Sequence, residues 1–227
     1  LALWVLEGWP GLQLKLPHIL GSDGSGVISA VGEGVRRFRP GDRVAINPTI
    51  CNDPTDPLAR LGFDNMCDDF AVFGEHVDGF YAEYAAVPER NLLALPDNVA
   101  YESAAAASLV FVTAWHSLIT RGQLRAGESI LIVGAGGGVN TAAIQIARLA
   151  GATPILVVGS SARKLEQARE LGADITINRH EVAWSREVHG LTGKRGVDVV
   201  VDNVGAATFH DSLRALRRGG RLLTVGN

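Results

Sequence analysis

The sequence predicts an α/β protein in which a doubly wound parallel sheet follows a β-rich domain. A cluster of glycines at 134–138 stands between an aliphatic run and an amphipathic helical pattern. Beyond it, aliphatic runs and helical patterns alternate, as in a parallel sheet with helices on both faces. Before residue 97, short apolar runs are separated by Gly and Pro turns, which favours a small barrel or sandwich.

The glycine cluster organises the chain. An aliphatic run at 129–133 meets four glycines, and a helical pattern starts at 139. In this order, glycines let the backbone approach a pyrophosphate, and the helix N-terminus presents free N–H groups to it. A strict G-x-G-x-x-G motif would need a further glycine at Val139 or Thr141. The chain has Asn140 instead, and a plain tight turn of an α/β protein remains an alternative.

The remaining elements follow from hydrophobic periodicity and turn residues. In the second half we expect strands at 129–133, 155–158, 175–177, 197–201 and 221–225, and helices at 101–120, 139–150, 162–171, 181–189 and 207–218. In the first half we expect strands at 26–31, 43–46, 81–87 and 92–95, and a lobe at 47–79. The boundary follows Pro96, which gives domains 1–97 and 98–227. A complete dinucleotide-binding sheet has six strands and the chain starts with leucine, so both ends are expected to be cut.

Composition excludes several classes of function. The formal charge is −3 with both signs interspersed, so the basic stripe of a nucleic-acid-binding protein is missing. No apolar run reaches the roughly 18 residues of a membrane span. Two cysteines and the lack of a leader pattern at the start predict a reduced, cytoplasmic protein.

Several motifs together resemble the medium-chain dehydrogenase/reductase superfamily, which joins a GroES-like barrel to a Rossmann domain. They span nearly the whole chain in the family's order. These motifs are LPHILGSDGSG at 16–26, VGEGV at 31–35, FRPGDRV at 38–44, GFYAEY at 79–84, VTAW at 112–115, AAIQIA at 142–147, ELGA at 170–173, GVDVV at 196–200 and RGGR at 218–221.

The resemblance implies that catalytic zinc is absent. The family's zinc enzymes have Gly-His-Glu where this chain has Gly21-Ser22-Asp23, and Leu109 aligns with a cysteine ligand. Catalytic zinc needs three protein ligands. Asp23 is interpreted as a structural carboxylate of the barrel rather than a catalytic one.

The family's structural zinc is not expected either. Zinc members often hold it in the lobe with four cysteines, whereas this lobe has only Cys51 and Cys67. Asp53, Asp56 and Ala59 align near the other ligands, and aspartates replace thiolates poorly. The prediction is a relict lobe without metal.

A nicotinamide dinucleotide is the implied cofactor, with NADP(H) favoured over NAD(H). NAD sites carry an acid at the end of the second strand, whereas the strand at 155–158 is followed by Ser160, Arg163 and Lys164. These side chains could bind a 2′-phosphate; alternatively, Ser161 caps the helix and the two cations are its solvated face. The predicted cofactor-binding residues are Thr113, Gly134, Ala135, Gly136, Gly137, Gly138, Val139, Asn140, Ser160, Arg163, Lys164, Asn203, Val204 and Gly226.

The resulting hypothesis is an NADPH-dependent reductase that transfers hydride to a quinone or an α,β-unsaturated carbonyl without zinc. An alcohol dehydrogenase and a non-enzymatic module with the cofactor fold remain alternatives. The catalytic residue is not identified; Tyr81, Tyr84 and His76 are candidates, although the two tyrosines are expected to pack in the barrel. The resemblance also implies a small-molecule substrate and a homodimer or homotetramer.

Overall fold

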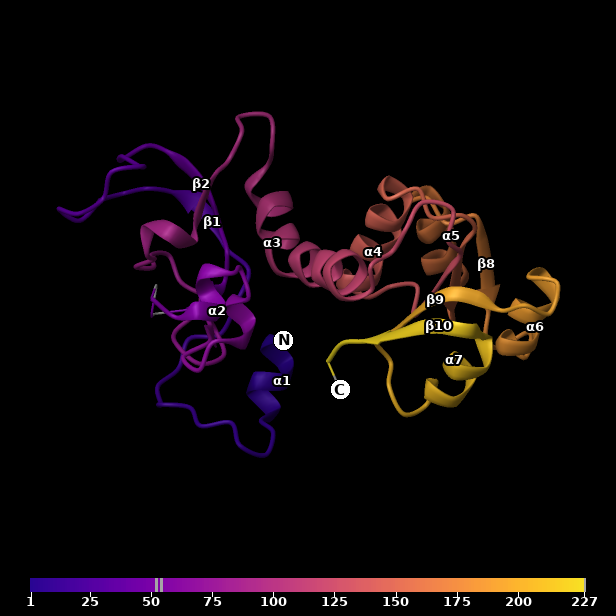
Figure 1. The fold of residues 1–227 in the computed structure, drawn as a ribbon. Coiled ribbons are helices and arrows are strands. Elements are labelled where there is room, and N and C mark those ends of the chain that lie inside the picture. The colour runs from indigo at the N-terminus through magenta and orange to yellow at the C-terminus, as the bar shows by residue number, and fades with distance from the viewer. Residues whose placement is uncertain (52, 54, 227) are drawn as a thin grey trace. The chain divides into compact units, whose positions relative to one another are not determined.

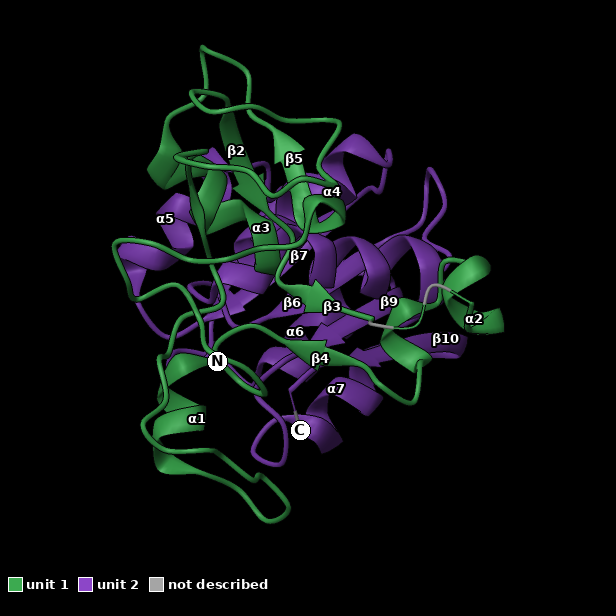
Figure 2. Cartoon of the chain, turned by 90° about the vertical axis from the view of Figure 1, so that its left-hand side faces the viewer, with its two compact units in different colours: residues 1–109 green, residues 110–227 purple. Residues whose placement is uncertain are grey.

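The computed structural model describes residues 1–51, 53 and 55–226 and divides into two compact units, Leu1–Leu109 and Val110–Asn227 (Figure 2). The sequence-based division was at 97/98. In the structure the chain passes from one unit to the other inside helix α3, Tyr101–Trp115. Each unit is described by itself.

The first unit contains a three-stranded antiparallel sheet of order β1-β2-β5. Val44, Ile46 and Leu92 form its core, with Phe38 and Phe80 packed against them. The elements of this unit before α3 are α1 (Ala2–Glu7), β1 (Ser25–Val27), β2 (Arg43–Ile46), β3 (Thr49–Ile50), α2 (Pro57–Arg60), η1 (Asp64–Met66), β4 (Ala71–Val72), η2 (Glu89–Asn91) and β5 (Leu92–Ala94).

The strand predicted at 81–87 is wrong. Backbone N–H groups of Gly79, Phe80 and Tyr81 donate to the carbonyls of residues 19–21, but no strand follows. Tyr81 and Tyr84 are 70% and 78% exposed, so the segment has no buried face, and the expectation that these tyrosines pack in the barrel is also wrong. Alternating apolar letters mark a strand only where one face is buried.

The second unit is built on a five-stranded parallel sheet of order β10-β9-β6-β7-β8. Figure 1 labels β8, β9 and β10 of this sheet. The first strand of the unit, β6, is central, and the chain winds outward from it in both directions. This confirms the predicted doubly wound sheet. The elements after α3 are η3 (His116–Arg121), β6 (Ile130–Val133), α4 (Gly138–Leu149), β7 (Ile155–Gly159), α5 (Ala162–Glu170), β8 (Ile175–Asn178), α6 (Trp184–Leu191), β9 (Val197–Asp202), α7 (Phe209–Ala215) and β10 (Leu216–Thr224).

Alternate residues of the central strand enter two different cores. Ile130 and Ile132 pack in a cluster with residues of α4 and α5. Leu131 and Val133 pack in a second cluster, where Trp184 of α6 is buried. Successive side chains of a strand point to opposite faces of the sheet, and here helices cover both faces. Every residue of a central strand is therefore buried, which explains the continuous aliphatic runs in the sequence.

The last predicted helix is too long at its C-terminal end. Arg217 and Arg218 were expected in its final turn, but α7 ends at Ala215 and β10 begins at Leu216. Arg217 donates to the Asp198 carboxylate, and the register of β10 against β9 shifts between Leu216 and Arg221. An ion pair to the neighbouring strand therefore competes with the helical preference of this segment.

Among the described residues, one helical stretch, Tyr101–Arg121, is long and apolar enough to cross a membrane by length and composition. Core helices of soluble proteins share this length and composition.

Candidate functional site: the carboxyl edge of the parallel sheet

The glycine turn lies where the strand order reverses, between β6 and its neighbours β7 and β9. Gly134 has φ +106°, in the left-handed region, and Gly137 precedes α4 with an extended backbone. No side chain caps this helix, so its first N–H groups stay available for an anion. Open α/β sheets bind ligands at this position.

Asn140 is a structural clamp of the turn. It is 4% exposed, and its Nδ2 donates to the carbonyl oxygens of Val133 (2.8 Å) and Gly134 (2.6 Å). Its Oδ1 accepts a hydrogen bond from Asn203 Nδ2 at 2.7 Å. The departure from the strict motif therefore ties the end of β6 to the loop that follows β9.

Asp202, at the end of β9, holds the loop that carries Asn203. It is fully buried and accepts hydrogen bonds from Thr208 Oγ1 (2.8 Å), Ser212 Oγ (2.6 Å) and the N–H of Val204 (2.9 Å). A buried carboxylate that accepts several hydrogen bonds is a fixed point of the backbone. Asp202 is not among the predicted site residues, although an acid that ends an aliphatic strand just before Asn-Val-Gly is a usable signal.

A pocket of about 440 Å³ opens beside the turn. Ser160 follows β7, Lys164 lies on α5 and Arg179 follows β8. No acidic residue lines the described part of the pocket. The lining residues are Val133, Gly134, Ala135, Gly136, Gly137, Gly138, Val139, Asn140, Val158, Gly159, Ser160, Lys164, Arg179, Asn203 and Val204.

The pocket collects most of the predicted cofactor-binding residues but leaves three outside. Gly134 to Asn140, Ser160, Lys164, Asn203 and Val204 line it. Arg163 lines a different depression, with Glu166 and Arg169. Thr113 and Gly226 are not among the lining residues. Arg179 was missed; it lies two residues after the strand predicted at 175–177, and such positions gather at the carboxyl edge of a parallel sheet.

In the first unit, Ser22 and Asp23 occupy positions that align with catalytic zinc ligands of the family's zinc enzymes. Ser22 is 4% exposed, and its Oγ has no hydrogen-bond partner in the described part of the chain. Burial raises the pKa of the Asp23 carboxyl, and a hydrogen bond from the Leu109 backbone opposes the shift. His76 Nδ1 accepts from the N–H of Val72 (3.2 Å), which gives that ring a structural role.

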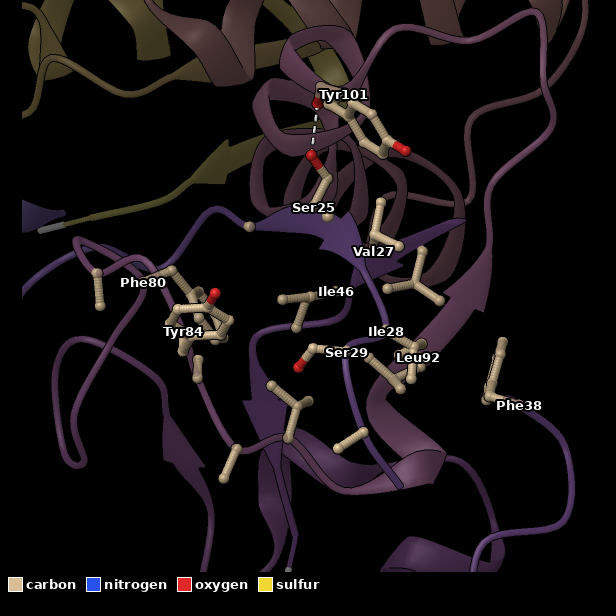
Figure 3. Close-up of a pocket in the computed structure, with 18 of the residues that line it drawn as sticks. Ser25, Val27, Ile28, Ser29, Phe38, Ile46, Phe80, Tyr84, Leu92 and Tyr101 are labelled. Carbon is tan, nitrogen blue, oxygen red and sulfur yellow. Dashed lines mark hydrogen bonds between the residues drawn. The ribbon is translucent and has the colours of Figure 1, made fainter. Parts of the chain in front are cut away.

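The barrel unit has its own cavity of about 600 Å³ (Figure 3). Ile28, Ile46, Phe80 and Leu92, which belong to or pack on the small core, line it together with polar groups. Ser25 Oγ donates to the carbonyl of Tyr101 at 2.7 Å. The apolar part of the cavity wall is therefore formed by the core of this unit.

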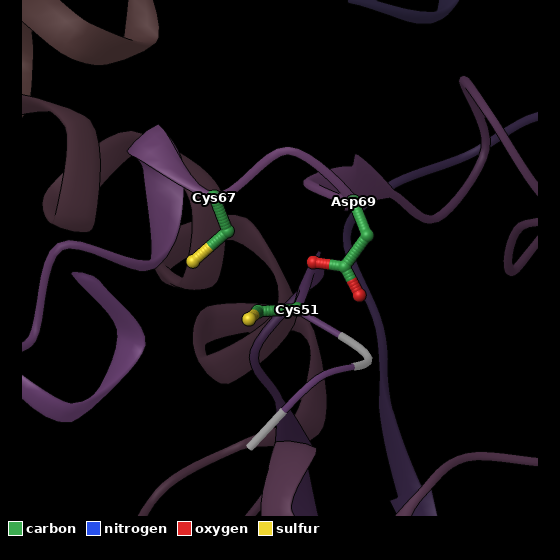
Figure 4. A group of neighbouring side chains, drawn as sticks. All are labelled: Cys51, Cys67 and Asp69. Atoms are coloured by element: carbon green, nitrogen blue, oxygen red, sulfur yellow. The ribbon is translucent and has the colours of Figure 1, made fainter. Parts of the chain in front are cut away.

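In the lobe, the two aspartates that align with zinc ligands serve local turns. Asp53 Oδ1 accepts from Thr55 Oγ1 (2.6 Å), and Asp56 Oδ1 accepts from the N–H of Leu58 (2.6 Å) at the start of α2. A different carboxylate, Asp69, lies beside the two cysteines (Figure 4).

Both halves of the chain match family models. Residues 3–97 match the alcohol dehydrogenase GroES-like domain, and residues 138–227 match the zinc-binding dehydrogenase model. Acryloyl-coenzyme A reductase from Metallosphaera sedula is 36% identical over 217 residues, which cover 95% of this chain and 62% of the relative. Quinone oxidoreductase from Homo sapiens is 31% identical over 226 residues, which cover 99% of this chain and 60% of the relative.

Solved structures agree with this assignment. An NAD-dependent alcohol dehydrogenase is 45% identical with a TM-score of 0.90, covering 93% of this chain and 61% of the other. A zinc-binding dehydrogenase from Sinorhizobium meliloti bound to NADP is 28% identical with a TM-score of 0.83, covering 93% of this chain and 62% of the other. This chain spans about 60% of the length of its relatives. It belongs to the medium-chain dehydrogenase/reductase superfamily, as an alcohol dehydrogenase-like member with a GroES-like and a Rossmann domain.

Proposed function

We propose that the protein containing this chain is an NADPH-dependent reductase of quinones or α,β-unsaturated carbonyl compounds that works without catalytic zinc. One observation carries the proposal: the nucleotide pocket is lined by Ser160, Lys164 and Arg179 and by no described acid. Ser22 and Leu109 at the aligned ligand positions support the zinc-free part.

The pocket suits a dinucleotide. A Cβ on Gly136 would lie 2.4 Å from Lys164 Cδ, so glycine leaves room for this side chain across the turn. A Cβ on Gly137 would meet nothing within 4 Å, which leaves the backbone at the start of α4 open to a pyrophosphate. Asn203 Oδ1 is buried without a partner among the described residues, and a ribose hydroxyl could donate to it. A bound nicotinamide would supply the hydride.

Charge favours the phosphorylated cofactor. The 2′-phosphate of NADPH carries close to two negative charges, and Lys164 and Arg179 offer two positive charges beside Ser160. An NAD site would instead place a carboxylate at the end of β7 for the ribose hydroxyls. Lys164 and Arg179 are therefore assigned to the 2′-phosphate. Arg163, Thr113 and Gly226 remain weaker candidates, because they lie outside the pocket.

The proposed substrate class rests on the relatives and on Ser22, which stands where the family's zinc enzymes have a histidine ligand. Acryloyl-coenzyme A reductase and quinone oxidoreductase are among the curated relatives. Reduction of an activated double bond or a quinone adds hydride and a proton, and orientation of the cofactor against the acceptor is the main requirement. A cytoplasmic homodimer or homotetramer is part of the same proposal.

An NAD-dependent alcohol dehydrogenase is the second candidate. It is favoured by the 45% identity to a solved enzyme of that description, the highest identity among the structures compared above. The two candidates differ in cofactor, in substrate and in the need for metal.

The test uses the full-length protein and its Cys67→Ser variant, which removes a possible metal ligand of the lobe. NADPH oxidation is measured with a quinone and with an enone, NAD⁺ reduction is measured with primary and secondary alcohols, and bound zinc is quantified. The proposal predicts NADPH oxidation by the metal-free variant. Activity that depends on zinc in this variant, or alcohol oxidation with NAD⁺ as the main reaction, would contradict it.

A further inference from the structure

A second cavity of the first unit, about 390 Å³ in volume, lies beside α1. Its wall contains the exposed apolar side chains of Leu3 and Trp4 and the hydroxyl-bearing residues Ser22 and Tyr81. An apolar wall with a few polar groups suits a small, uncharged organic molecule. The Asp23 carboxylate in the same wall disfavours an anion at this place.

The Ser22 hydroxyl is buried without a hydrogen-bond partner among the described residues. Buried hydroxyl groups of folded proteins are nearly always hydrogen-bonded, so an unpaired one at a cavity wall indicates a ligand that completes it. The larger cavity of this unit offers no equivalent group, because none of its described lining residues has an unpaired buried polar atom. The smaller cavity is therefore the better candidate for a ligand site.

Close packing fixes the backbone around Ser22. Gly21 has φ +98°, and a Cβ on it would overlap the Tyr81 ring. A Cβ on Gly79 would overlap the carbonyl oxygen of Gly21, so the segments that precede Ser22 and Tyr81 meet through glycine backbone. The N–H of Tyr81 also donates to the carbonyl of Leu20 at 2.9 Å. A donor that is held in place in this way stabilises a developing charge without reorganisation.

We propose that Ser22 is a catalytic residue whose hydroxyl donates to the carbonyl oxygen of a neutral enone or quinone bound in this cavity. The inference rests on the reductase activity proposed above. Hydride addition to the β-carbon of an enone moves the electron pair of the C=C bond towards the carbonyl oxygen, which gains the negative charge, and water supplies the proton of the product. The hydrogen bond from Ser22 strengthens as this charge develops, so it lowers the barrier of the chemical step.

The experiment compares the full-length wild type with Ser22→Ala, using cyclohexenone as the acceptor and NADPH as the donor. Loss of the hydroxyl should lower kcat at least tenfold and leave the Kd of NADPH unchanged. The thermal midpoint of unfolding should not fall, because the substitution removes an unpaired buried hydroxyl. Ser29→Ala, which changes an exposed serine outside this cavity, should keep the kcat of the wild type.

A second readout is independent of turnover. In infrared difference spectra of isotope-labelled cyclohexenone bound with NADP⁺, the carbonyl stretching band should lie at a lower wavenumber in the wild type than in Ser22→Ala, because a hydrogen bond weakens the C=O bond. Equal kcat values, equal band positions, or a fall of kcat that parallels a fall of the thermal midpoint would overturn the role of Ser22. No enone turnover by the wild type, with the band difference present, would instead refute the proposed function and leave the Ser22 contact standing.

Discussion

Asn203 Nδ2 donates to Asn140 Oδ1 at 2.7 Å, and this hydrogen bond joins the helix after β6 to the loop after β9. Asn140 also holds the carbonyls of Val133 and Gly134. The asparagine in the glycine motif thus replaces close glycine packing with a hydrogen-bonded clamp on both sides of the nucleotide pocket.

This clamp predicts coupling between two substitutions. Asn140→Ala should lower the free energy of unfolding by about 1–3 kcal/mol, because it leaves the buried carbonyl of Val133 and the Asn203 amide unpaired. In a double-mutant cycle with Asn203→Ala, measured by urea unfolding, the coupling should reach about 0.5–3 kcal/mol. The exposed Asn98→Ala is the control. Additive effects of the two substitutions would show that the clamp contributes nothing.

The two cations of the pocket should act on one phosphate. Lys164→Gln and Arg179→Gln should each weaken NADPH binding about tenfold, or about 1.4 kcal/mol, and leave NADH binding nearly unchanged. Titration calorimetry with both nucleotides measures this. Arg163→Gln is the comparison: Arg163 neighbours Lys164 but lies outside the pocket, so its loss should weaken NADPH binding less than either of these substitutions. Equal losses for NADPH and NADH would assign the cations to the shared pyrophosphate instead.

A carboxylate at the end of β7 should reverse the cofactor preference. Ser160→Asp places a negative charge beside the 2′-phosphate and offers an acceptor to the ribose hydroxyls of NADH. We expect the ratio of kcat/KM for NADPH to that for NADH to fall at least tenfold. Ser160→Ala, which removes the hydroxyl without adding charge, should change the ratio only slightly. An unchanged ratio in Ser160→Asp would refute the assignment of this position.

The Asp198 network predicts acid sensitivity. Burial alone would raise the pKa of Asp198, but hydrogen bonds from Ser129 (2.9 and 2.6 Å) and pairing with Arg217 and Arg195 lower it to about 2. Because the folded-state pKa lies below the unfolded value of 3.8, the group stabilises the fold above about pH 4 and loses this contribution as the pH falls towards 2.

At neutral pH the lowered pKa of Asp198 contributes about 2 kcal/mol to the free energy of unfolding. Denaturant unfolding between pH 7 and pH 3 should therefore show a steeper loss of stability for the wild type than for Asp198→Asn. The exposed Asp97→Asn should behave as the wild type. Parallel curves for the wild type and Asp198→Asn would contradict the network's role.

Periodicity predicted the parallel sheet and most of the pocket, because strand burial and glycine turns leave local signals. The missed features depend on partners distant in sequence. The segment 81–84 has the alternation of a strand, but it has no buried face. Arg217 lies beyond the end of α7, where it donates to the Asp198 carboxylate. Arg179 joins Lys164 only because β8 and β7 are paired. Asp69 was not among the predicted lobe residues, since the pairing of β3 with β4 brings it to Cys51.

The most direct test of the central claim is titration calorimetry of the unmodified protein with NADPH and with NADH under identical salt. The account predicts one site in which NADPH binds at least tenfold more tightly, because the pocket carries Lys164, Arg179 and Ser160 and no described acid. Equal or tighter binding of NADH, or no binding of either nucleotide, would contradict it.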